Sequence, residues 1–164
     1  MLQLFLLMTL FLAVIYYDIR YYLIPNRLTF TFIVIGWAVS LYSYGISGLF
    51  ESLTGTLVGF IILFIPFLFG AVGGGDVKFL AALGSLASLS FLLKAVVGGF
   101  IIAAIVSIFI LIKNRKVTSI KHILFFILYR QKLTELSHSK AYIPLGAHMS
   151  IAGILLIFST WVGM

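Results

Sequence analysis

The sequence predicts an all-α, polytopic membrane protein with about six transmembrane helices, and three observations support this prediction. Hydrophobic residues make up 63% of the 164 residues. Charged residues make up 9%, against roughly a quarter in an ordinary soluble domain. The apolar residues form stretches close to the ~20 residues that span a bilayer, and polar turns separate these stretches. We therefore expect residues 1–164 to form a single membrane-embedded domain.

This composition excludes several classes of protein. Such an excess of apolar residues excludes a disordered chain and a soluble enzyme. The net charge of +7 does not indicate a nucleic-acid partner, because basic loops beside the anionic cytoplasmic leaflet give the same excess. The partner that the composition indicates is the lipid bilayer. The chain has no cysteine, which excludes a disulfide framework, a thiol nucleophile and a cysteine metal site.

Charges and turn residues divide the chain into six apolar stretches. In chain order these are Leu2–Tyr17, Leu28–Tyr44, Leu53–Val72, Val77–Leu93, Ala95–Ile112 and Ile143–Val162. The boundaries between them are a polar turn with Pro25-Asn26, a Gly/Ser turn at Gly45–Gly48, the run Gly73-Gly74-Gly75, the single charge Lys94, and a basic segment at about 113–140. The first stretch follows no basic segment and has no small-residue cleavage site, so we interpret it as a retained span.

The basic residues predict how the chain is threaded. The loops after the first, third and fifth stretches, together with Lys78 at the start of the fourth stretch, contain ten of the eleven Lys and Arg residues, and Lys94 is the exception. Cytoplasmic loops are enriched in Lys and Arg. The sequence therefore predicts that these three loops face the cytoplasm and that both termini lie outside. In the segment 113–140, apolar residues at helical spacing indicate a basic helix in the headgroup region, although a solvated loop explains the same composition.

Asp18 and Asp76 are the two aspartates of the chain, and the predicted topology gives them the same depth. Asp18 follows the first stretch and Asp76 follows the third, so both lie at the cytoplasmic face. Of the other acids, Glu51 lies on the outer side and Glu135 lies within the basic segment. An ionisable residue at a membrane helix end is a functional candidate because it is costly to place there. We therefore predict that the two aspartates act as a pair.

Paired carboxyls have the chemistry that peptide hydrolysis needs. Two close carboxyls cannot both ionise comfortably, so the pair shares a proton. The ionised member can activate water, and the protonated member can polarise the carbonyl and protonate the leaving amine. The sequence does not assign these two parts. Helix capping explains each aspartate alone equally well, a proton or cation relay in a small transporter explains the pair, and a non-enzymatic scaffold would use neither chemically.

Neighbouring residues suggest how the pair is surrounded. Gly73, Gly74 and Gly75 allow unusual backbone conformations and close approach of another chain, as an extended substrate requires. We interpret Lys78 as a cytoplasmic anchor, with contact to a carboxylate or a lipid phosphate as the alternative. The Pro25-Asn26 pair is expected to shape the turn and cap the second span. The three histidines have no ligand spacing, so we predict neither a metal nor a cofactor, and His148 is expected to be a packed core residue.

These residues resemble a known family. The matching segments are Asp18-Ile19-Arg20, Ile24-Pro25-Asn26 and Gly73-Gly74-Gly75-Asp76-Val77-Lys78. They are similar to the two signature regions of type IV prepilin peptidases, which are membrane aspartic proteases of the Gly-x-Gly-Asp type. Pro144-Leu145-Gly146 also resembles the Pro/Gly region of that family at the start of its last span. The resemblance extends over the whole chain except the segment 113–140.

The resemblance implies a specific activity. Asp18 and Asp76 would be the catalytic pair, and the substrate would be a pilin-like or flagellin-like precursor. Its leader would be cut at the cytoplasmic face of the cell membrane, usually after a glycine. Larger members carry a cytoplasmic Cys-x-x-Cys insertion and often methylate the new N-terminus. This chain has no cysteine and no room for the insertion between the first two spans. It therefore resembles the short, peptidase-only members of the tight-adherence pilus or archaeal preflagellin type, and we predict no methyl transfer.

Overall fold

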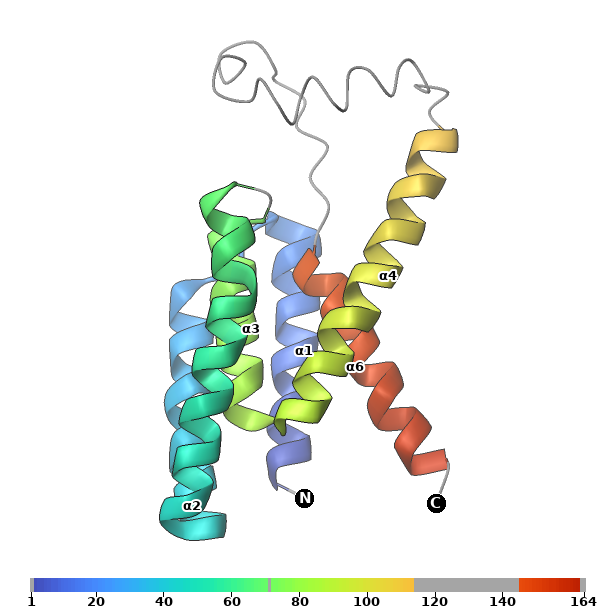
Figure 1. The fold of residues 1–164 in the computed structure, drawn as a ribbon. Helices are drawn as coiled ribbons and strands as arrows, with labels where there is room; N and C mark the ends of the chain where they lie inside the picture. The colour runs from blue at the N-terminus through green and yellow to red at the C-terminus, as the bar shows by residue number, and fades with distance from the viewer. Residues whose placement is uncertain (1, 71, 114–144, 163–164) are drawn as a thin grey trace. The chain divides into compact units, whose positions relative to one another are not determined.

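The computed structural model describes residues 2–70, 72–113 and 145–162. Every regular element in these ranges is a helix, which confirms the predicted all-α class (Figure 1). The helices are α1 (Leu2–Tyr21), α2 (Asn26–Leu68), α3 (Gly74–Leu86), α4 (Leu89–Lys113) and α6 (Leu145–Val162). The predicted basic segment at 113–140 lies outside the described residues, apart from Lys113 at the end of α4.

Helix α2 contains the second predicted stretch and most of the third, and it reverses direction between them; it ends at Leu68, four residues before the predicted end of the third stretch at Val72. Gly45 has φ 66° and ψ −152°, a combination that glycine adopts without strain, and the helical hydrogen bonding resumes directly after it. Two arms therefore lie side by side on either side of this residue (Figure 1). The reversal falls within the predicted turn Gly45–Gly48, so the sequence placed this boundary correctly.

The boundary between the fourth and fifth stretches was placed wrongly. Helix α3 ends at Leu86 and α4 begins at Leu89, whereas Lys94 lies inside α4. Ser88 explains the difference, because its hydroxyl accepts a hydrogen bond from the backbone N–H of Phe91 at 3.4 Å and so caps the new helix. Helix α3 therefore has 13 residues and is about 20 Å long, shorter than the ~30 Å bilayer core.

The chain forms two compact units, residues 1–102 with 144–164, and residues 103–143. In the first unit, α3 packs against both arms of α2 through small residues. A Cβ atom on Gly36 would lie 2.9 Å from the Cβ of Ser85, and one on Gly59 would lie 2.9 Å from the carbonyl carbon of Leu80. The hydroxyl of Ser52 donates a buried hydrogen bond of 2.5 Å to the backbone oxygen of Ser85. These contacts let the backbones of α3 and α2 approach closely, as small residues do between helices in membranes.

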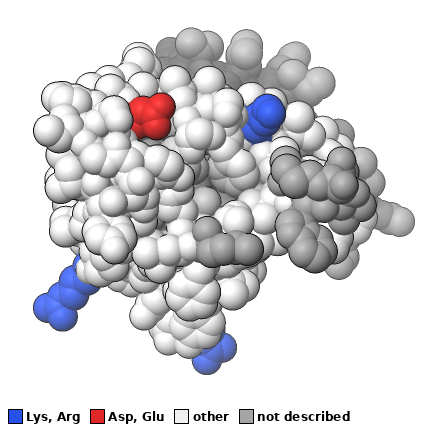
Figure 2. All heavy atoms as spheres, turned by 90° about the horizontal axis from the view of Figure 1, so that it is seen from below, with Lys and Arg blue, Asp and Glu red and all other residues white. Residues whose placement is uncertain are grey.

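Many large apolar side chains remain exposed outside this core. Phe5, for example, is 69% exposed, and Tyr42 is 91% exposed. Within the described residues, α1, α2 and the Leu89–Phe109 part of α4 are each long and apolar enough to cross a membrane. Seen from below, the described residues are mostly uncharged, with a few separate acidic and basic side chains (Figure 2). The long apolar helices support the prediction of a membrane protein.

Candidate active site

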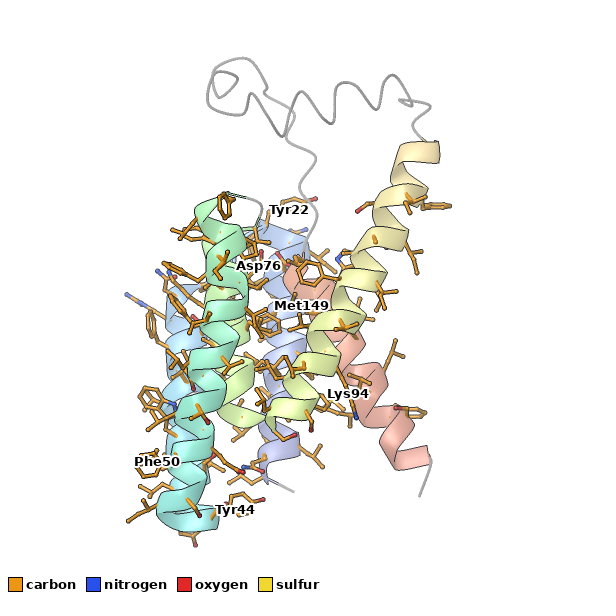
Figure 3. The ribbon with its side chains drawn as sticks, viewed as in Figure 1. Tyr22, Tyr44, Phe50, Asp76, Lys94 and Met149 are labelled. Carbon is orange, nitrogen blue, oxygen red and sulfur yellow. The ribbon has the colours of Figure 1, made fainter. Side chains whose placement is uncertain are left out.

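Asp18 and Asp76 lie close together at one end of the first unit. Asp18 is in the last turn of α1, and Asp76 is the third residue of α3. Their side chains are 0% and 3% exposed. Figure 3 shows Asp76 near Tyr22, at the opposite end of the helices from Tyr44 and Phe50. Two residues that are 58 positions apart in the sequence are thus brought to the same depth in the bundle.

The first turn of α6 contacts both carboxyls. The backbone N–H of Gly146 donates to Oδ1 of Asp76 at 2.9 Å, and that of Ala147 donates to Oδ2 of Asp18 at 2.8 Å. A Cβ atom placed on Gly146 would lie 3.1 Å from each of these two oxygens, so the oxygens are no more than 6.2 Å (twice 3.1 Å) apart. This upper limit is close to the ~5.6 Å that one water can bridge with two hydrogen bonds.

Asp76 also caps its own helix. Its Oδ2 accepts a hydrogen bond from the backbone N–H of Gly73 at 3.3 Å, while Oδ1 faces α6. The capping interpretation is therefore correct for Asp76, and it does not compete with pairing, because the two oxygens have different partners. Backbone donors at a helix N-terminus favour a negative charge.

The surroundings of Asp76 raise its pKa. The residue lies outside the three helices that can cross a membrane. Burial is the main cause and the nearby Asp18 carboxyl is the second, and together they raise the pKa of Asp76 from 3.8 to about 6. The N–H groups of Gly73 and Gly146 lower the pKa and offset part of this increase. A carboxyl in this position can hold or release a proton near neutral pH.

The glycine run acts through space and not through unusual backbone angles. Within the described residues, positive φ angles occur at Tyr22, Gly45 and Gly70, so Gly73, Gly74 and Gly75 have none. The expectation of a special conformation there is wrong. The close approach of a substrate chain to these glycines stays a prediction, and the approach that the structure shows is within the chain, because a Cβ atom on Gly75 would lie 3.2 Å from the Cβ of Ile24. The approaching chain is the protein's own turn after α1.

That turn also connects to α3 through Lys78. The Nζ of Lys78 donates to Oδ1 of Asn26 at 2.7 Å, so its ammonium is bound to the turn and not to the carboxyl pair. Pro25 precedes α2 in an extended conformation, with φ −62° and ψ 134°. The expectation that Asn26 caps α2 is wrong, because no side chain donates or accepts a capping hydrogen bond at the start of this helix. The side-chain oxygen of Asn26 accepts the hydrogen bond from Lys78 instead.

Two neighbours of the pair, Ile24 and Gly146, were named only as parts of the resembling segments, without an expected contact to the carboxyls. Ile24 is 4% exposed, and its Cδ1 atom would lie 2.8 Å from a Cβ atom on Gly146. An amide donor has no side-chain signature, so Gly146 was noticed only for its resemblance to a Pro/Gly region. His148 is buried in α6, as expected for a packed residue. The described residues contain no group of three potential metal ligands.

The fold and this site define a class: an all-helical membrane protein with two buried carboxyls at one end. The model of the type IV leader peptidase family matches residues 5–108, which include both aspartates. The chain therefore belongs to the type IV leader peptidase family, and the resemblance of its motifs to prepilin peptidases is confirmed. Among curated proteins and solved structures, none matches the chain.

Proposed function

We propose that this protein is an aspartic endopeptidase of the cell membrane that removes the leader of type IV prepilin-like precursors at the cytoplasmic face. Membership of a leader peptidase family supports peptide hydrolysis and this class of substrate. The observation that carries the aspartic mechanism is the pair of buried carboxyl oxygens no more than 6.2 Å (twice 3.1 Å) apart at the start of α6. A small transporter that relays protons through the same residues is not favoured by the family match.

In the proposed mechanism the two carboxyls share one proton. The ionised member removes a proton from a water that attacks the scissile carbonyl. The protonated member donates a hydrogen bond to the carbonyl oxygen and then protonates the leaving amine. The raised pKa of Asp76, about 6, supports a shared proton near neutral pH. The titration belongs to the pair, so neither aspartate is assigned one fixed part.

The proposed topology has six crossings, in which the two arms of α2 count separately and α3 is a crossing shorter than the bilayer core with Asp76 at its cytoplasmic end, and both termini lie on the outer side. Helix α1 runs toward the carboxyl pair and α6 runs away from it, so Leu2 and the end of α6 lie at the same end of the first unit (Figure 1). This end is opposite the carboxyls. The arrangement supports a catalytic face in the cytoplasm if the basic loops obey the positive-inside rule.

The test is cleavage of a coexpressed pilin-like precursor by the wild type, Asp18→Asn and Asp76→Asn. Asparagine keeps the size and the acceptor oxygen but cannot exchange a proton, so each variant should lose about 10²–10⁴-fold in cleavage rate. Glu51→Gln is the matched control, because this acid is exposed on α2 and should leave the rate unchanged. Equal cleavage by the wild type and both asparagine variants would overturn the proposal.

A further inference from the structure

The first turn of α6 has two features that the proposed reaction has not yet used. Its consecutive N–H groups each donate to one oxygen of an aspartate. The space beside its glycine is too small for a side chain between the two carboxyls. The family match ends at residue 108, so this turn lies outside the matched region. We propose that the start of α6 is the third component of the active site, in which Gly146 is a positioning residue for the carboxyl pair. This inference rests on the proposed function.

The two amides set the spacing of the carboxyls. Gly146 and Ala147 are neighbours in one helical turn, so the distance between their N–H groups is fixed by helix geometry. Each holds a carboxyl from a different helix, at 2.9 Å for Asp76 and 2.8 Å for Asp18. The first N–H groups of a helix have no partner within it, so these bonds also satisfy donors that would otherwise be buried and unpaired.

The absent side chain is equally important. A Cβ atom on Gly146 would lie 3.1 Å from Oδ2 of Asp18 and 3.1 Å from Oδ1 of Asp76, tighter than nine in ten real Cβ contacts. Alanine would therefore push both carboxyls away from the amides that hold them. Ala147 tolerates its own Cβ atom in a buried position, so the requirement for glycine is confined to one residue of the turn.

A second contact must be separated from this one. The same Cβ atom would lie 2.8 Å from Cδ1 of Ile24, so Gly146→Ala disturbs a side chain of the turn as well as the carboxyls. Ile24→Val removes this Cδ1 atom and little else. The double variant Gly146→Ala with Ile24→Val therefore retains the carboxyl contacts of the alanine and lacks the Ile24 contact.

A third variant controls for helix packing. Gly153 lies on the same helix, and a Cβ atom there would lie 2.7 Å from Cε2 of the Phe11 ring on α1. Gly153→Ala thus strains the packing of α6 against α1 without a described contact to a carboxyl. The amount of folded Gly153→Ala protein shows how much a packing defect in α6 alone changes folding, and Gly146→Ala is compared with it.

Cleavage of a pilin-like precursor is measured for these variants as kcat and KM per folded molecule. Gly146→Ala is expected to lower kcat about 10–100-fold with little change in KM, because a misplaced catalytic group affects the reaction more than substrate binding. Ile24→Val should not restore the rate of the double variant. Restoration by Ile24→Val would overturn the inference, as would a rate for Gly146→Ala that matches Gly153→Ala.

A second measurement does not depend on cleavage. Infrared titration follows the protonated carboxyl of Asp76, which is identified by its loss in Asp76→Asn. The titratable groups of the neighbouring helices are the carboxyl of Asp18 on α1 and the buried His148, which lies two residues after Gly146 on α6, while Lys78 on the same helix as Asp76 is bound to Asn26. The N–H of Gly146 lowers the pKa of Asp76, so Gly146→Ala should move the titration to higher pH.

The two measurements separate the possible failures. An unchanged titration in Gly146→Ala, or an equal shift in Gly153→Ala, overturns the positioning role whether or not any precursor is cut. Equal cleavage by wild type, Asp18→Asn and Asp76→Asn overturns the proposed function, while a titration shift confined to Gly146→Ala would still support the positioning of the carboxyls by α6.

Discussion

Two regions of this protein use glycine for close approach, and they do so with different consequences. Where α3 meets α2, a Cβ atom on Gly84 would lie 3.1 Å from the backbone nitrogen of Thr56, so backbone lies against backbone. Where α6 meets the ends of α1 and α3, a Cβ atom on Gly146 would lie 3.1 Å from two carboxyl oxygens. The contact in the first region contributes only to stability, whereas the contact in the second region also keeps two ionisable groups at a fixed spacing.

Replacing a carboxyl should give the largest separation between the two regions. Asp18→Asn is expected to lower the cleavage rate about 10²–10⁴-fold while the free energy of unfolding changes by about 1 kcal/mol or less. The small stability change follows because the amide can still accept the hydrogen bond from Ala147 N–H, which is 2.8 Å long in the wild type. Precursor cleavage and unfolding in detergent measure the two quantities. If Asp18→Asn fails to fold, the main contribution of Asp18 is to stability, which contradicts the prediction.

The pH dependence of stability should reveal the same carboxyl region. The pKa of Asp76 is raised from 3.8 to about 6, so the folded state binds this proton more tightly than the unfolded state does. Stability is therefore highest below pH ~4 for this group and decreases as the pH rises to ~6, by on the order of 3 kcal/mol. Unfolding of the wild type and Asp76→Asn across this range measures the effect. The decrease should be absent from the variant, and equal slopes would contradict the expectation.

A substitution in the packing region should show the converse pattern. Gly84→Ala places a methyl group against the backbone of α2, which cannot rotate away as a side chain can. We expect a loss of about 1–3 kcal/mol in the free energy of unfolding, with the cleavage rate of each folded molecule unchanged. Unfolding in detergent and cleavage corrected for folded protein test this. A lower rate per folded molecule would show that the α2–α3 packing reaches the site.

The sequence predicted the class of the fold because this class follows from composition summed along the chain and does not depend on which residues touch. Apolar stretches and the excess of basic loops indicate a helical membrane protein without any knowledge of packing. The error at Lys94 has a local cause, since a charge was taken as the boundary while Ser88 caps the helix. Short polar caps are harder to recognise than charges when a serine can also be a packing residue within a span.

The sequence predicted the carboxyl pair and missed the elements that hold it. Asp18 and Asp76 were identifiable because acids are scarce and the topology gave them one depth. The contacts of Ile24 and the amide of Gly146 were not, because an apolar side chain and a backbone donor look the same in a sequence wherever they lie. Gly73–Gly75 were noticed for conformational freedom, but Gly75 acts through its close approach to Ile24.

The smallest expected effect concerns Lys78, which lies next to the carboxyl region but is bound to the turn. Its Nζ is 2.7 Å from Oδ1 of Asn26 in an exposed position, so the hydrogen bond competes with water. Lys78→Met keeps the apolar stem and removes the donor, and we expect at most about 1 kcal/mol in the free energy of unfolding. The cleavage rate and its pH profile should match those of the wild type. A shift of the acid limb of the pH–rate profile would instead show that the ammonium of Lys78 acts on the carboxyl pair. Lys78 would then belong to the carboxyl region.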